Sequence, residues 1–92
     1  MNRAVHLIIE GKVQGVGYRA WFFARAKDAS LRGWVRNRRN GTVEAVISGE
    51  EETLSTFIKS CWRGPMAARV DNVTNEQYSR PVPPSFEVLP TI

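Results

Sequence analysis

The chain has 92 residues, of which 42% are hydrophobic and 24% are charged, and this composition is that of an ordinary globular protein. Its length predicts a single domain over residues 1–92, built around one two-layer core. The formal charge of +4 is uneven, because residues 1–46 carry nine Lys and Arg against three Asp and Glu. This basic half predicts an anionic partner, which could be a nucleic acid, a membrane surface or a phosphorylated small molecule.

Several classes of protein are excluded by what the sequence lacks. Its single cysteine, Cys61, rules out an intrachain disulfide framework and any multi-cysteine metal site. No apolar run approaches the roughly 20 residues that cross a bilayer. The first residues have too short an apolar core and too early an acid, Glu10, for a secretory signal. We therefore expect a soluble cytoplasmic protein.

The first half of the chain predicts a strand, a loop, a helix and a hairpin, in that order. Apolar and polar residues alternate over residues 4–11, as in a strand with one buried face. Residues 12–17 hold two glycines and no periodicity, which indicates a loop, and a helix is expected from residue 19 to about residue 30. A second strand over residues 31–37 leads into the turn 38–41, whose Asn-Gly pair favours a type I′ hairpin.

The second half predicts another strand, a strongly amphipathic helix and one or two further strands. Residues 42–48 form the third strand. Gly64 ends the second helix, residues 68–77 predict a fourth strand, and residues 85–89 a short fifth one. The apolar face of the second helix follows the i, i+3, i+4, i+7, i+8 spacing and consists of Leu54, Phe57, Ile58, Cys61 and Trp62.

The order of elements, β-α-β-β-α-β, predicts an α+β fold, the ferredoxin-like split βαβ sandwich. Two helices would cover one face of a four- to five-stranded, mainly antiparallel sheet. The right-handed crossover rule makes the first two strands parallel, with the third strand between them and running the opposite way. The loop after the first strand and Asn37, at the end of the second, should therefore meet at one edge of the sheet.

The loop between the first strand and the first helix has the composition of an anion site. Its sequence, GKVQGVGYR over residues 11–19, contains glycines that let successive N–H groups point into one concavity. The helix N-terminus adds further unpaired N–H groups, and Arg19 adds a guanidinium that fits phosphate oxygens. From these residues alone, a plain tight connection with a surface arginine is equally open. The candidate binding residues are Gln14, Gly15, Val16, Gly17, Tyr18 and Arg19.

Two segments resemble the acylphosphatase family, namely GKVQGVGYR at residues 11–19 and GWVRNRRNGTVEAVISG at residues 33–49. The resemblance extends over essentially the whole chain. It implies that Arg19 binds the substrate phosphate together with the loop amides and that Asn37 positions the attacking water. One departure is Asn40, where the family often has Asp before the turn glycine, and it puts nothing catalytic in doubt.

The resemblance implies an acylphosphate phosphohydrolase, a metal-independent enzyme that splits the carboxyl-phosphate bond of acyl phosphates. A carboxylate is a good leaving group, so positioning and electrostatics suffice for catalysis. We expect no metal and no cofactor, and a monomer whose partners are acyl phosphate and inorganic phosphate rather than a membrane or nucleic acid.

Two alternatives are a small RNA-binding module and a regulatory phosphate-binding module on the same fold. RNA-binding modules of this fold stack bases on aromatic residues of the central strands, and the first and third strands here contain none. The regulatory alternative is less favoured because both catalytic positions are intact and no second domain is visible.

The remaining chemically capable residues have structural interpretations. His6 lies in the middle of a strand and is expected to be a sheet-face residue, while Cys61 is expected in the core. Trp21 and Trp34 are interpreted as packing residues. A solvated charged turn, which could also steer anionic substrates, is the interpretation of three arginines, Arg36, Arg38 and Arg39.

Overall fold

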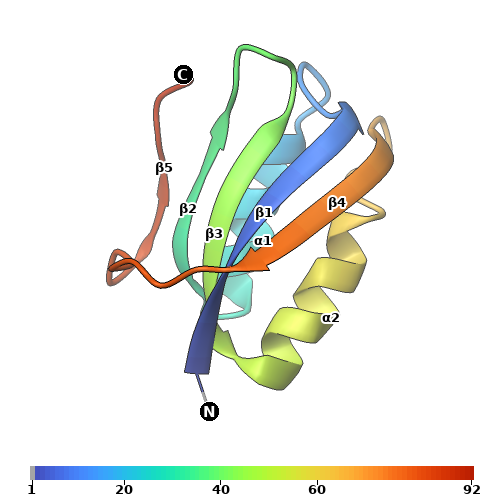
Figure 1. Cartoon of the computed structure of the whole chain (residues 1–92). Coiled ribbons are helices and arrows are strands. Elements are labelled where there is room, and N and C mark those ends of the chain that lie inside the picture. Colours follow the sequence, from blue (N-terminus) through green and yellow to red (C-terminus); the bar gives the residue numbers. More distant parts are fainter. Residues whose placement is uncertain (1) are drawn as a thin grey trace.

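The structure, a computed structural model, describes residues 2–92 and contains two helices and a five-stranded sheet (Figure 1). The elements are β1 (Asn2–Lys12), α1 (Tyr18–Asp28), β2 (Arg32–Asn37), β3 (Val43–Glu50), α2 (Glu51–Cys61), β4 (Arg69–Gln77) and β5 (Phe86–Val88). The predicted ferredoxin-like sandwich, including its short fifth strand, is confirmed. Within residues 2–92, no helix is long and apolar enough to cross a membrane.

The strand order is β4-β1-β3-β2-β5, so β3 lies between β1 and β2. It pairs with both in the antiparallel sense, whereas β5 joins the edge beside β2 and runs parallel to it. Both helices cover the same face of the sheet (Figure 1). The C-terminal ends of β1 and β2 therefore lie at the same end of the sheet, as the crossover rule predicts.

The core lies between this sheet face and the two helices. Alternate residues of β1 and β3 point into it, as the period of two in a strand requires. From the helices, Phe22 of α1 and Phe57 of α2 meet in a T-shaped contact with ring centroids 5.0 Å apart. The buried strand residues on this face are Val5, Leu7, Ile9, Val43, Ala45 and Ile47.

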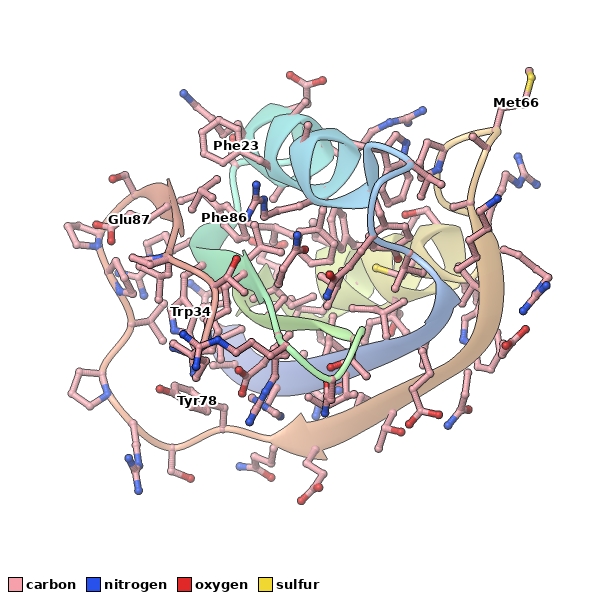
Figure 2. All side chains as sticks on the ribbon, turned by 90° about the horizontal axis from the view of Figure 1, so that it is seen from above. Phe23, Trp34, Met66, Tyr78, Phe86 and Glu87 are labelled. Carbon is pink, nitrogen blue, oxygen red and sulfur yellow. The ribbon has the colours of Figure 1, made fainter. Side chains whose placement is uncertain are left out.

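The opposite face of the sheet is also partly covered. Figure 1 shows the segment after β4 crossing this face on its way to β5, and Figure 2 shows Trp34 and Tyr78 on the same side, away from the helices. The Tyr78 ring stacks on His6 with centroids 6.4 Å apart, and Trp34 meets His6 edge-on at 6.5 Å. Consequently β3 is buried on both faces over residues 43–48. The interpretation of His6 as a sheet-face residue and of Trp34 as a packing residue is confirmed.

The hairpin between β2 and β3 differs from the predicted type I′ turn. That turn requires positive φ at both central residues, but among residues 38–41 only Gly41 has one, at 93°. Instead, Gly41 N donates to Arg38 O at 3.0 Å and Arg38 N donates to Thr42 O at 2.9 Å, which closes a three-residue loop ending in the left-handed glycine. The Asn40 side chain accepts a hydrogen bond from Thr42 N at 3.1 Å and holds Asn40 outside the left-handed region.

The second helix agrees with its predicted apolar face except at Trp62. Leu54, Phe57 and Cys61 are buried and Ile58 packs against the core, but α2 ends at Cys61 and leaves Trp62 47% exposed. The periodicity of a helix places residues on one face only while the helix continues. Trp62 is the C-cap and keeps helical backbone angles, but it lies past the last turn of α2 that packs on the sheet, so the prediction that it belongs to the buried face was wrong.

Tyr18 is a core residue that the apolar pattern did not predict. It is the first residue of α1, is 1% exposed, and its hydroxyl donates a 2.7 Å hydrogen bond to the carbonyl of Cys61 at the end of α2. Burial raises the pKa of Tyr18, so the hydroxyl stays protonated and can donate. This bond ties the start of one helix to the end of the other.

Replacing Tyr18 by Phe should lower the free energy of unfolding by about 1–2 kcal/mol, because the buried Cys61 carbonyl loses its partner while the ring is kept. Urea denaturation of the variant and the wild type measures this difference. The matched control is Tyr78→Phe, on the far face of the sheet, which should change stability by less than about 0.5 kcal/mol. Equal losses of unfolding free energy in Tyr18→Phe and Tyr78→Phe would show that the Tyr18 hydrogen bond does not stabilise the fold.

Candidate active site

The loop joining β1 to α1, residues 13–17, carries unpaired backbone donors. Gly15 and Gly17 have φ values of 74° and 82°, which favour glycine and turn the peptide planes inward. Within the described residues, none of the N–H groups of residues 14–20 donates to a backbone carbonyl, and the first to do so is that of Trp21, to Gly17 O at 3.0 Å. A row of free N–H groups at a helix N-terminus is suited to an anion.

A cleft of about 470 Å³ opens between this loop, the start of α1 and the sheet edge. It brings together most of the predicted site, but Val16 does not line it and instead packs against the core. The predicted meeting of the loop with Asn37 at one sheet edge is therefore observed. The lining residues are Val13, Gln14, Gly15, Gly17, Tyr18, Arg19, Ala20, Phe23, Asn37 and Val88.

Arg19 is the cleft's only charged lining residue among those described. It lies half-buried in the first turn of α1 and forms none of the ion pairs found among residues 2–92. A guanidinium held at the cleft without a carboxylate partner keeps its hydrogen-bond donors available for a phosphate or carboxylate ligand.

Asn37 is the last residue of β2 and presents an acceptor without a partner. Its Oδ1 atom is buried and forms no hydrogen bond with any described residue. Buried polar atoms in native proteins are almost always paired, so an unpaired amide oxygen at a cleft indicates a binding position for a donor such as water.

The side chain of Gln14 has a role that the sequence did not reveal. Its Nε2 atom donates to the carbonyls of Arg38 and Thr42, at 2.7 and 2.8 Å, and so attaches the glycine loop to the hairpin that follows Asn37. The partners are 24 and 28 residues away, and no local pattern indicates such contacts.

The other candidate groups lie outside the cleft. Cys61 is fully buried in the core, and burial raises its pKa to about 12, so its thiol is not a reactive thiolate at neutral pH. This confirms its interpretation as a core residue. His6 binds Glu44 on the far face of the sheet. Among residues 2–92, no group of three or more His, Cys, Asp or Glu is placed to hold a metal ion.

Fold and cleft together define a class of protein, a ferredoxin-like sandwich in which a glycine loop, an arginine and a strand-end asparagine share one sheet edge. A family model described as Acylphosphatase matches residues 5–88. The chain belongs to the acylphosphatase family, as the loop and hairpin motifs predicted.

Individual relatives agree with this assignment. An acylphosphatase of Rhodopseudomonas palustris is 56% identical over 70 residues, covering 76% of this chain and 71% of that protein. An acylphosphatase of Azorhizobium caulinodans is 45% identical over 95 aligned residues, covering 100% of both. The structure of an acylphosphatase from Coxiella burnetii superimposes with a TM-score of 0.91 at 34% identity, covering 96% of this chain and 93% of that one.

Replacing Gln14 by Ala should loosen the glycine loop, because two carbonyls of the hairpin lose their donor. We expect the dissociation constant of inorganic phosphate to rise roughly fivefold, the effect of about 1 kcal/mol of lost preorganisation. Isothermal titration calorimetry with phosphate measures this. Gln77→Ala, at an exposed position on β4, is the control. Unchanged phosphate affinity in Gln14→Ala would show that the loop holds its shape without this side chain.

Proposed function

We propose that the chain is a metal-independent acylphosphatase that works through the cleft at the β1–α1 loop. A water oxygen attacks phosphorus, the bond from phosphorus to the acyl oxygen breaks, and a carboxylate and inorganic phosphate leave. The observation that carries this mechanism is the meeting in one cleft of free loop amides, an arginine outside the observed ion pairs and the unpaired oxygen of Asn37. The acylphosphatase relatives favour this reaction over a small RNA-binding or regulatory module.

In this mechanism the phosphate is held by the loop. The N–H groups of Gln14, Gly15, Val16, Gly17 and Tyr18 point their dipoles at its oxygens, and Arg19 adds a forked, charged donor. Charge spreads over the phosphoryl oxygens in the transition state, and donors already fixed in place stabilise it without reorganisation. Residues 15 and 17 fix the shape of this cradle through their left-handed backbone.

Asn37 orients the attacking water. Its buried Oδ1 accepts one hydrogen bond from the water, which leaves an oxygen lone pair directed toward phosphorus. An amide cannot take up a proton at neutral pH, so the water proton passes to an oxygen of the substrate's own phosphate. The cleft therefore needs no ionisable base, metal ion or cofactor.

The acyl group extends toward the apolar part of the cleft. Ala20 and Phe23 of α1 and Val88 of β5 line that part, and Val88 is held beside β2 by the parallel pairing of Val35 with Val88. Since the polar lining residues surround the phosphate position, the apolar ones are left for the carbon skeleton. An aromatic acyl phosphate such as benzoyl phosphate fits this division and is a suitable test substrate.

We further propose that the active form is a monomer of one domain, residues 1–92, acting in the cytoplasm on small acyl phosphates and not on nucleic acid. One chain supplies every residue of the proposed mechanism, because the loop, Arg19 and Asn37 all line the same cleft.

Replacing Arg19 by Ala should lower kcat/KM for benzoyl phosphate by at least about 1,000-fold, because the charged donor that lines the cleft is lost. Hydrolysis is followed by ultraviolet absorbance with EDTA present. The wild-type rate should be unaffected by EDTA, and circular dichroism should show an unchanged fold. Arg39→Ala, on the exposed hairpin, is the matched control and should remain active. Ordinary turnover by a folded Arg19→Ala variant would rule out the proposed mechanism.

Replacing Asn37 by Ala should reduce kcat by roughly 100-fold while KM and phosphate affinity change little, because water, not phosphate, loses its partner. Steady-state kinetics and phosphate inhibition separate the two effects. In the wild type, kcat should vary little between about pH 5 and pH 8, since no ionisable base takes part. Weakened phosphate binding with normal kcat would instead place Asn37 at the phosphate.

A further inference from the structure

Glu44 is a nearly buried acid that lies on β3 behind the hairpin, and the mechanism above does not use it. Its side chain is 8% exposed. Its Oε1 atom accepts a 2.8 Å hydrogen bond from Arg36 Nε and lies 3.4 Å from Arg38 Nη1. Its Oε2 atom lies 2.6 Å from His6 Nε2 on β1. One carboxylate of β3 therefore joins side chains from both flanking strands, His6 of β1 and Arg36 of β2, and from the hairpin residue Arg38.

Two of these partners stand on either side of Asn37 in the sequence. Successive side chains along an extended chain point to opposite faces, so Arg36 and Arg38 reach the far face while Asn37 points into the cleft. Both arginines approach the same oxygen of Glu44. The backbone at Asn37 is thereby held from both sides.

The direction of the Asn37 side chain depends on the position of its backbone. Its Oδ1 atom has no hydrogen-bond partner among residues 2–92, so no neighbouring donor fixes the direction of the amide oxygen. On the cleft side, Gln14 holds the Arg38 carbonyl at 2.7 Å. Arg38 is thus fixed by Glu44 through its side chain and by Gln14 through its carbonyl.

We propose that Glu44 is a positioning residue for the water-binding Asn37 and acts through Arg36 and Arg38 from the opposite face of the sheet. The proposal rests on the proposed function, because it concerns the same water. A misplacement of about 1 Å at a reacting group can reduce a rate roughly 100-fold, so restraint of this backbone has a catalytic effect. Glu44 itself does not contact the cleft.

The charge of Glu44 is kept by its surroundings. Burial by itself would raise the pKa of this carboxyl, but hydrogen bonds from His6 and Arg36 outweigh it and hold the pKa below its ordinary value. Two further acids lie on the strands packed beside this cluster: Glu76 of β4 pairs across from His6, and Glu87 of β5 pairs beside Trp34. Both are exposed. Arg36 also makes a cation–π contact with Trp34, in which its guanidinium carbon lies 4.7 Å from the ring centroid.

The first test replaces Glu44 by Gln, which keeps the shape and removes the charge. We expect kcat for benzoyl phosphate to fall roughly five- to tenfold, while KM and the inhibition constant of inorganic phosphate stay within twofold. Asp71→Asn is the matched control, because Asp71 forms an exposed pair with Arg69 and should leave kcat unchanged. Unchanged kcat in Glu44→Gln, or an equal loss of phosphate affinity, would overturn the proposal.

A double-mutant cycle distinguishes positioning from general support of the fold. If Glu44 acts through Asn37, Glu44→Gln should have almost no further effect on kcat in an Asn37→Ala background. The same five- to tenfold loss in both backgrounds would show that Glu44 acts elsewhere, and the proposal would fail. A wild type without turnover of benzoyl phosphate would instead refute the proposed function itself.

A second variant covers the case in which Glu44→Gln folds poorly, and a pH series tests the charge of Glu44. Arg38→Gln alters a more exposed partner and should also lower kcat without changing phosphate affinity. Because the folded pKa of Glu44 is lowered, its stabilisation is complete above the ordinary carboxyl pKa and is lost as the pH falls through the lowered value. The Tm of the wild type should therefore exceed that of Glu44→Gln at pH 7 and approach it in acid. A normal kcat in a folded Arg38→Gln variant would contradict the proposal.

Discussion

The position of β3 between β1 and β2 is the constraint on which the site depends. Because β3 runs antiparallel to both, the loop after β1 and the end of β2 emerge at one edge. The residues that meet there, Arg19 and Asn37, are 18 positions apart in the chain. Neither needs a special local structure beyond the left-handed glycines of the loop. The sheet provides the distance between them, and Gln14 then fixes the loop to the hairpin.

Most of the fold was predictable because it depends on local periodicity. Alternation in the strands and the apolar face of α2 follow from burial on one side of an element. The mistakes arose at turns and helix ends, which periodicity does not specify, and at one contact between distant residues. Trp62 continues the apolar pattern but lies beyond the end of α2, and the Asn40 side chain bonds to Thr42 in a three-residue loop instead of the expected turn. Tyr18 is buried through its contact with Cys61.

The candidate site was likewise predictable only in part. Arg19 and Asn37 were found from motifs and from the topology that brings their positions together, whereas the contacts that hold them were not. Gln14 contacts two carbonyls of the β2–β3 hairpin, and Glu44 contacts His6 of β1 and Arg36 of β2. A sequence pattern does not specify such pairs. The structure also shows how charge is distributed. Glu44 on the far face pairs with Arg36 and Arg38. Among residues 2–92, the lining of the cleft includes one cation, Arg19, and no acid that would repel phosphate.

The buried Cys61 allows opening of this fold to be measured by thiol labelling. It is the chain's single cysteine, it is fully buried, and its pKa is raised to about 12, so a thiol reagent meets almost no thiolate in the native protein. Labelling must wait until α2 separates from the sheet and from Tyr18, which covers the end of that helix. The labelling rate therefore reports how often the two layers part, and a bound phosphate that holds the start of α1 in place would slow it.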